Sequence, residues 1–189
     1  MTKKGKLIVL SAPSGAGKTT IARAILEKFD NLRFSISATT RNPRPNEKQA
    51  HDYFFLTKED FTRRVANNEF VEWEEVYGQY YGTLWSHINE MLDSGKNIIL
   101  DIDVKGGLNI QKKFGHDVLT IFIMPPDLNT LKERLKSRKT ESDDLIKLRL
   151  ERVPMEMEVG KEFQHVVVND DLQKAIAEVL QLITDFIKN

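Results

Sequence analysis

The segment SAPSGAGKTT at residues 11–20 constrains this chain more than any other feature. It follows a β-branched apolar run at residues 6–11, and residues 19–29 after it carry apolar side chains at helical spacing. Small residues between a strand and a helix let successive backbone N–H groups turn inward, and the helix N-terminus adds partial positive charge. The segment therefore predicts a phosphate-binding loop that joins a buried strand to a helix.

The spacing of this loop matches G-x-x-x-x-G-K-[ST], except that Ala12 stands at the first glycine. Alanine restricts the backbone there only if the position requires a positive φ. We expect Lys18 to bridge the outer phosphates of a nucleoside triphosphate and the Thr19 hydroxyl to ligate Mg²⁺. The alternative is a Gly-rich turn with no ligand. The residues expected to surround the phosphates are Ala12, Pro13, Ser14, Gly15, Ala16, Gly17, Lys18, Thr19 and Thr20.

Three further apolar runs, at residues 97–103, 118–124 and 166–168, are each followed by a helical pattern. After the first of these runs, Gly106 and Gly107 separate the strand from a helix predicted at residues 108–114. After the second run, Asp127 is a candidate cap of the next helix. Buried strands that alternate with helices predict an α/β fold with a central parallel sheet covered on both faces.

Two segments break this alternation. Residues 35–84 contain short strand-like runs with turn residues between them and one predicted helix at residues 58–67, which indicates a mostly antiparallel insertion. Residues 128–158 are dense in charge and contain several arginines, which favours helical arms of a mobile flap around residues 137–142.

Composition narrows the function classes. The chain has 28 Lys plus Arg and 28 Asp plus Glu, which argues against a protein that coats a polyanion. With no cysteine it has no disulfide or thiolate metal site, and its apolar runs are too short to span a bilayer. Residues 1–6 lack the apolar stretch of a signal peptide. We expect a cytoplasmic protein, with no nucleic-acid, membrane or protein partner implied.

The insertion must identify the second substrate, because hydrolases, switches, motors and kinases share phosphate loops. Arg41 and Arg44 flank a proline and make a fork for a second phosphate, to which two tyrosines could donate. The carboxylate of Glu72 suits the adjacent N1–H and N2–H donors of guanine, whose O6 needs a hydroxyl donor. The polar residues considered with these are Ser37, Tyr53, Tyr81, Thr83 and Asp103.

The chain resembles guanylate kinases over nearly its whole length. The motifs that carry the resemblance, in order, are SAPSGAGKTT, SATTRNPRPNE with HDYFF, EFVEWEEVYGQYYGT, ILDIDVKG, MPPDLNTLKERLKSRKTESDD and VVVND. The resemblance implies a P-loop three-layer fold with an inserted GMP-binding subdomain and a helical lid. Its implied boundaries are residues 1–34, 97–126 and 159–189 for the core, 35–96 for the insertion, and 127–158 for the lid with flanking helices.

The resemblance implies transfer of the γ-phosphoryl group of Mg-ATP to GMP, and by expectation to dGMP. It places guanine against Ser37, Glu72, Thr83 and Asp103, and the GMP phosphate against Arg41, Arg44, Tyr53 and Tyr81. It also implies catalytic roles for Lys18, Arg134, Arg138 and Arg149, and an adenine-bordering position for Asn169. Asp101 is a candidate Mg²⁺ ligand through water, with capping of the following turn as the alternative.

The sequence departs from the family pattern in a few places, none of which removes a functional group. They are Ala12, Asn46, Ala50, Thr83 and Lys139. Three other functions stay open at this stage. A guanylate-kinase-like scaffold that binds phosphopeptides predicts a degraded phosphate loop; a GTPase switch predicts an N-K-x-D-like motif, which the segment at residues 169–171 does not match; an adenylate-type kinase predicts a different acceptor base.

Overall fold

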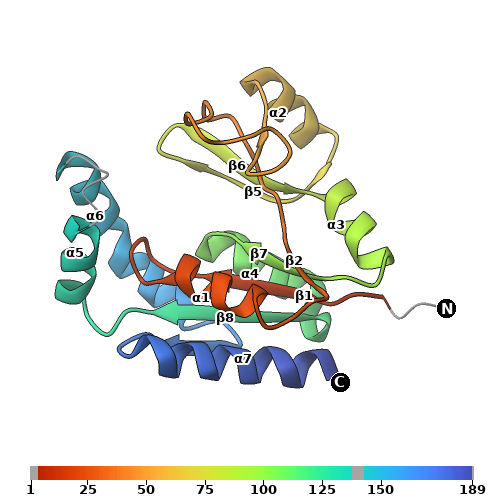
Figure 1. Ribbon diagram of the computed structural model, residues 1–189. Helices are drawn as coiled ribbons and strands as arrows, with labels where there is room; N and C mark the ends of the chain where they lie inside the picture. The colour runs from red at the N-terminus through yellow and green to blue at the C-terminus, as the bar shows by residue number, and fades with distance from the viewer. Residues whose placement is uncertain (1–3, 138–142, 189) are drawn as a thin grey trace. The chain divides into compact units, whose positions relative to one another are not determined.

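A computed structural model describes residues 4–137 and 143–188 (Figure 1). The first half of the chain contains β1 (Leu7–Ser11), α1 (Lys18–Leu26), β2 (Leu32–Phe34), β3 (Ala38–Thr39), β4 (Phe54–Phe55), α2 (Lys58–Ala66), β5 (Phe70–Val76), β6 (Gln79–Leu84) and α3 (Trp85–Asp93). The second half contains β7 (Asn97–Asp101), α4 (Val104–Phe114), η1 (Gly115–Asp117), β8 (Val118–Met124), α5 (Leu128–Ser137), α6 (Asp143–Gly160), β9 (His165–Val168) and α7 (Leu172–Lys188).

The predicted central sheet is confirmed: five parallel strands lie in the order β2-β7-β1-β8-β9. Its middle strands are fully buried along Ile8 to Leu10 and Ile121 to Ile123, because both faces are covered. Helix α7 contacts α1, β8 and β9, while α4 and α6 contact each other and β8. This arrangement is the α/β layering that the alternating pattern predicts.

A second sheet has the order β4-β3-β6-β5. Strand β6 pairs antiparallel with both β3 and β5, and β3 pairs parallel with β4, so the insertion is mostly antiparallel as expected. Its core contains Ala38, Phe61, Phe70 and Leu84. The Phe61 ring stacks on that of Phe70 with centroids 4.4 Å apart, which fixes α2 against the sheet.

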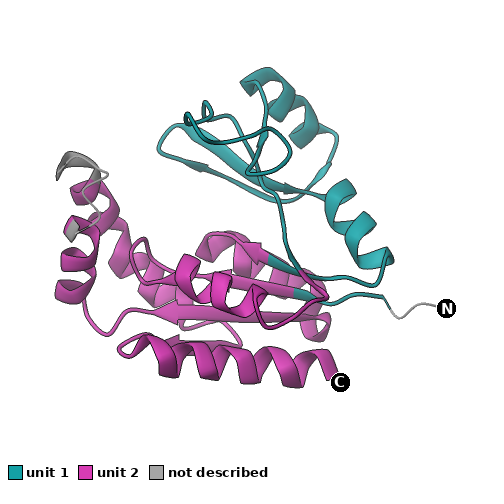
Figure 2. Cartoon of the chain, viewed as in Figure 1, with its two compact units in different colours: residues 1–7, 33–99 teal, residues 8–32, 100–189 magenta. Residues whose placement is uncertain are grey.

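The chain divides into two compact units (Figure 2). Unit 1 comprises residues 1–7 and 33–99, and unit 2 comprises residues 8–32 and 100–189. The unit boundaries fall inside β1, β2 and β7. The division of the chain into core, insertion and lid stays a prediction.

Several local predictions were wrong. Helix α4 begins at Val104, so it includes the two glycines that we expected to precede it. Gly107 lies within the helix, and a Cβ there would meet the ring of Phe163 at 2.5 Å, so this packing leaves no room for a larger residue. The predicted strand at residues 97–103 ends at Asp101, since the Asp103 side chain instead caps α4.

Helix α3 was not predicted, although its buried Ile88 and Leu92 are four residues apart. The helical pair predicted within residues 128–158 is present as α5 and α6, and Asp127 caps α5 by accepting from Thr130 N at 2.8 Å. None of the helices in the described ranges has the length and apolar character needed to cross a membrane.

Candidate nucleotide-binding sites

The loop between β1 and α1 takes the backbone conformation that its glycines allow. Gly15 has φ 92° and Gly17, the N-cap of α1, has φ 98° in the left-handed region. Only glycine adopts this region without strain, which explains the fixed second glycine of the motif, Gly17, and the presence of glycine at the variable position 15. Ala16 N donates to Pro13 O at 3.1 Å and closes the turn. Ala12 has no positive φ, so its methyl group imposes no left-handed strain.

At the first turn of α1, Lys18 Nζ forms an ion pair with the Asp101 carboxylate at the end of β7. The next side chains, Thr19 and Thr20, are exposed. A hydroxyl and a carboxylate are the hard oxygen ligands that Mg²⁺ prefers. Within the described ranges no three His, Cys, Asp or Glu side chains gather as a metal site. Binding of Mg²⁺ by Thr19 and Asp101 stays a prediction.

The back of the loop is held by Asn169, whose side chain is 2% exposed. Its Nδ2 donates to Ala16 O at 2.7 Å, and its backbone N donates to Met124 O at 2.8 Å. A Cβ placed on Gly17 would meet the same Nδ2 atom. Asn169 thus links the end of β8 to the loop, and its side-chain amide is engaged there; contact with adenine stays a prediction.

Two of the three predicted lid arginines lie at the loop. Arg149 Nη1 on α6 donates to Ser14 Oγ, and Arg134 Nη2 on α5 donates to Asn169 O at 3.2 Å. The third, Arg138, lies outside the described residues, as does Lys139. An apolar cluster packs α5 and α6 onto the loop; its buried members are Ala16, Leu131, Leu135, Ile146 and Val153. The helices and the loop therefore form one packed region of unit 2.

Two carboxylates near these cations, Asp103 and Glu156, are half-buried. Asp103 Oδ1 accepts from Gly106 N at 2.7 Å, and burial raises the pKa of Asp103, partly offset by that hydrogen bond and nearby cations. Burial likewise raises the pKa of Glu156, which lies 3.6 Å from Arg152 Nε and within the field of Lys18. Sequence reasoning missed Glu156; its only signal is the i, i+4 spacing from Arg152.

In unit 1, two predicted guanine contacts face each other across the antiparallel pair β5–β6. Glu72 is in register with Thr83, and Thr83 Oγ1 donates to Glu72 Oε1 at 2.8 Å. Both are buried, with 9% and 0% exposed. Ser37 is half-buried next to β3, and its carbonyl accepts from Phe54 N. A buried carboxylate beside a hydroxyl is an arrangement that can read adjacent donors and an acceptor on one base edge.

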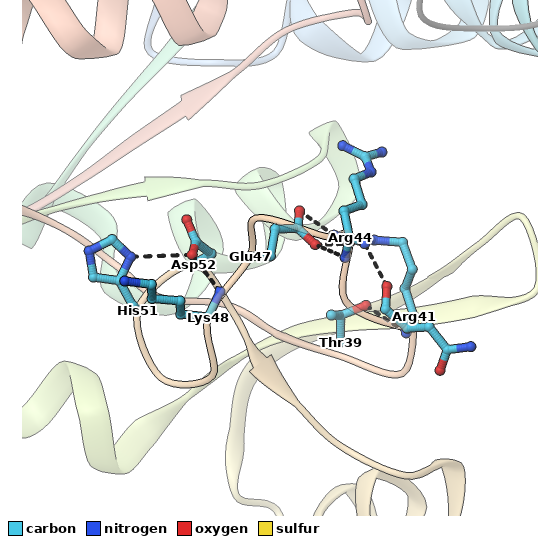
Figure 3. A network of polar contacts seen from close by, with 8 residues as sticks. Thr39, Arg41, Arg44, Glu47, Lys48, His51 and Asp52 are labelled. Atoms are coloured by element: carbon cyan, nitrogen blue, oxygen red, sulfur yellow. Dashed lines mark hydrogen bonds and ion pairs between the residues drawn. The ribbon is translucent and has the colours of Figure 1, made fainter.

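Unit 1 also gathers three of the four predicted phosphate contacts. The Arg41 guanidinium lies 5.3 Å from the centroid of the Tyr53 ring, and the Tyr53 and Tyr81 rings are 6.4 Å apart in an edge-to-face arrangement. Arg44 is exposed, and Figure 3 shows its guanidinium extended away from the neighbouring carboxylates. The four side chains supply cationic and phenolic donors, which suits an anionic group.

Glu47 is a functional candidate that the sequence did not reveal. Its carboxylate pairs with the Arg41 guanidinium through two hydrogen bonds of 2.9 Å (Figure 3). This pairing raises the pKa of Arg41 and lowers the pKa of Glu47. In the same loop Ala50 has φ 58°, so the alanine that replaces the family glycine does adopt a left-handed backbone. The strain costs about 1–2 kcal/mol.

Comparisons with known proteins agree with this geometry. The family model described as guanylate kinase matches residues 4–186. The chain is 48% identical over 184 residues to a guanylate kinase from Bacteroides thetaiotaomicron, covering 97% of this chain and 90% of that protein. It is 45% identical over 183 residues to one from Chlorobium luteolum, covering 97% and 93%.

A solved structure is similar as well. The crystal structure of guanylate kinase from Anaplasma phagocytophilum superposes with a TM-score of 0.78 at 29% sequence identity, covering 99% of this chain and 88% of that chain. The family model and the curated relatives both extend over almost the whole sequence. The chain belongs to the guanylate kinase family.

Proposed function

We propose that this chain transfers the γ-phosphoryl group of ATP to GMP, giving ADP and GDP. The choice of GMP as the acceptor rests on the buried pair of Glu72 and Thr83. Phosphate loops occur in many enzymes, but a buried carboxylate beside a hydroxyl matches the N1–H, N2–H and O6 groups of guanine. Adenine presents a different pattern, and it would leave the carboxylate without its donors.

The donor site in this proposal is the phosphate loop of unit 2. Backbone N–H groups from residues 12–20 bind the triphosphate, and Lys18 exchanges its contact with Asp101 for the outer phosphates. Thr19 and Asp101 would hold Mg²⁺, Asp101 through water. The ion, when bound, offsets part of the negative charge on the phosphate chain. Asn169 holds the loop from behind, and adenine is proposed to lie beside this residue.

The acceptor site is proposed in unit 1, and the contact of Asp103 with guanine stays a prediction. Glu72, Thr83 and Ser37 would bind the base, and the arginine and tyrosine groups would bind its phosphate. A phosphate oxygen of GMP is already anionic, so the attack needs no strong general base. The phosphoryl group would pass directly from ATP to GMP by an in-line transfer, without a covalent enzyme intermediate. Catalysis would come from positioning of the two substrates and from neutralisation of their charge.

The lid arginines would neutralise charge on the transferring group. Arg149 and Arg134 already lie against the loop through Ser14 and Asn169. The phosphopeptide-scaffold alternative predicts a degraded loop, whereas this loop keeps Gly15 and Gly17 at positive φ together with Lys18. Use of dGMP, Mg²⁺ dependence and a cytoplasmic location belong to the same proposal and stay predictions.

A coupled assay tests the proposal. ADP formation would be followed with ATP and Mg²⁺ while GMP, dGMP, AMP, UMP or CMP is offered as acceptor. We expect rapid turnover with GMP, measurable turnover with dGMP, and rates at least about 10²-fold lower with the other three, because none of their bases offers the buried carboxylate two adjacent N–H donors. Turnover that prefers AMP, or no turnover with any acceptor, would refute the assignment.

A further inference from the structure

The loop that carries the two candidate phosphate-binding arginines contains its own carboxylate (Figure 3). Glu47 Oε2 accepts from Arg41 Nη1 at 2.9 Å, and Glu47 Oε1 accepts from Arg41 Nη2 at 2.9 Å. The two side chains are only 20% and 17% exposed. A parallel two-bond pair of this kind fixes the plane of the guanidinium as well as its position.

The remaining donors of Arg41 show what this pairing leaves available. A guanidinium has five N–H groups in a fixed fork. Nη1 also donates to Asn42 O at 2.7 Å, so both of its hydrogens are engaged. The Nε hydrogen and the second Nη2 hydrogen form the other bidentate edge of the guanidinium. Arg41 also interacts with the phenol of Tyr81, which is itself a predicted phosphate contact. Glu47 and Asn42 thus hold one side of the fork, and a phosphate could meet the opposite edge together with Tyr81.

Other contacts resist rotation of this guanidinium. It lies over the rings of Tyr53 and Phe55, at 5.3 Å and 5.8 Å from their centroids. Glu47 is itself tied to the backbone, because its Oε2 accepts from Arg44 N at 2.7 Å and its N donates to Arg44 O at 3.0 Å. Displacing the carboxylate would break its hydrogen bond with Arg44 N together with the pair to Arg41, and would loosen the turn that carries Arg44.

We infer that Glu47 is a positioning residue for the acceptor phosphate: it holds one edge of Arg41 so that the other edge meets the phosphate. The inference rests on the proposed function. The rival reading, in which the carboxylate competes with the phosphate for Arg41, predicts the opposite sign, since removing a competitor would tighten binding. Positioning is favoured because the pair with Glu47 uses only the Nη1–Nη2 edge of the fork and because the carboxylate is anchored to the loop backbone.

The test compares Glu47→Gln with Asp52→Asn. Asp52 lies in the same polar network, where its partners are Lys48 N at 2.8 Å and the ring of His51, so its substitution removes the same charge from the same loop. Calorimetry would measure the dissociation constants of GMP and of guanosine, and steady-state kinetics the KM for GMP, the KM for ATP and kcat.

For Glu47→Gln we expect the dissociation constant and KM of GMP to rise about tenfold, because one charge-assisted pair is lost. Guanosine affinity and the KM for ATP should change less than about twofold, and Asp52→Asn should behave as the unmodified protein. A general loosening of the fold would weaken guanosine and GMP alike and would overturn the inference. Tighter or unchanged GMP binding in Glu47→Gln would overturn it as well.

A double-mutant cycle with Arg41→Ala shows whether Glu47 acts through that arginine. If it does, Glu47→Gln has little further effect on GMP affinity in the Arg41→Ala background; additive losses would contradict the inference. Should Glu47→Gln fail to fold, Glu47→Asp keeps the charge but shortens the reach, and the same weakening is expected for GMP alone. Failure of the unmodified protein to bind GMP at all would instead refute the proposed function.

Discussion

The two candidate sites are built in different ways. The loop of unit 2 uses main-chain geometry: left-handed Gly15 and Gly17 and the start of α1 shape it, while Asn169 supports it from behind. The site in unit 1 uses side chains: Glu72 meets Thr83 across two strands, and Arg41 meets Glu47 within one loop. A loop whose backbone N–H groups surround a phosphate binds it whatever base is attached, whereas paired side chains can select a base.

The two sites should therefore respond differently to substitution. A site made of backbone is sensitive to residues that change φ or crowd the turn, and tolerant of many side chains. A site made of side-chain pairs is sensitive to the exchange of single polar groups.

The largest effect is expected for the one charged side chain that the loop does require. Lys18→Met should lower kcat by about 10³-fold, because charge on the transferring group loses its nearest fixed cation. The coupled assay and the thermal unfolding midpoint would be measured together. Lys28→Met, an exposed change just beyond the end of α1, is the matched control. Normal turnover in Lys18→Met would contradict the donor site.

The acceptor site should respond to a single carboxylate. Glu72→Gln should raise the KM for GMP by about 10²-fold and leave the KM for ATP within about twofold, because an amide cannot accept from both guanine donors. Glu75→Gln on the exposed side of the same strand serves as control. Equal effects on both substrates would argue against a base-reading role in unit 1.

The phosphate loop depends on its backbone conformation, so one added methyl group should weaken both its stability and its binding of ATP. Gly17→Ala forces a non-glycine residue to φ 98° and places its Cβ against Asn169 Nδ2, so we expect about 2–3 kcal/mol loss of stability and weakened ATP binding. Gly78→Ala, at φ 76° with no atom within 4 Å of a Cβ, should lose only about 1 kcal/mol and bind ATP normally. Chemical denaturation and ATP titration give both quantities.

The smallest effect concerns pH. Burial raises the pKa of Glu156, so its contribution to stability is fully present below the pKa of the unfolded chain and is lost as pH rises through the folded pKa. Glu156→Gln cannot titrate, so its unfolding free energy should fall less than that of the unmodified protein as pH rises through this window. Glu158→Gln, an exposed change on the same helix, should leave the slope unaltered. Identical slopes in all three proteins would contradict the shift.

Much of unit 2 could be predicted because its signals are local. The glycine spacing predicts the loop, and the buried strands follow from continuous apolar runs. The α4 boundary was missed because Gly106 and Gly107 indicate a turn, whereas in the structure Gly107 is helical where it packs on Phe163. Tertiary packing overrides propensity there.

Unit 1 was harder, because its contacts depend on register. Glu72 and Thr83 are eleven residues apart, and only the pairing of β5 with β6 sets them opposite each other. The family resemblance suggested both residues, but no spacing rule links them. No sequence pattern indicated that Glu47 pairs with Arg41, because a carboxylate that follows two arginines in a loop is most often solvated. The positive φ of Ala50 could not be predicted either, because alanine rarely adopts a left-handed backbone conformation.

The central claim is that one chain carries two separable nucleotide sites, one made of backbone and one made of side chains. Calorimetric titration of GMP and of a non-hydrolysable ATP analogue into Lys18→Met and Glu72→Gln tests it most directly. We predict that Lys18→Met weakens only the ATP analogue and that Glu72→Gln weakens only GMP. If each variant weakened both ligands to the same extent, or if the unmodified protein bound neither, the account would be contradicted.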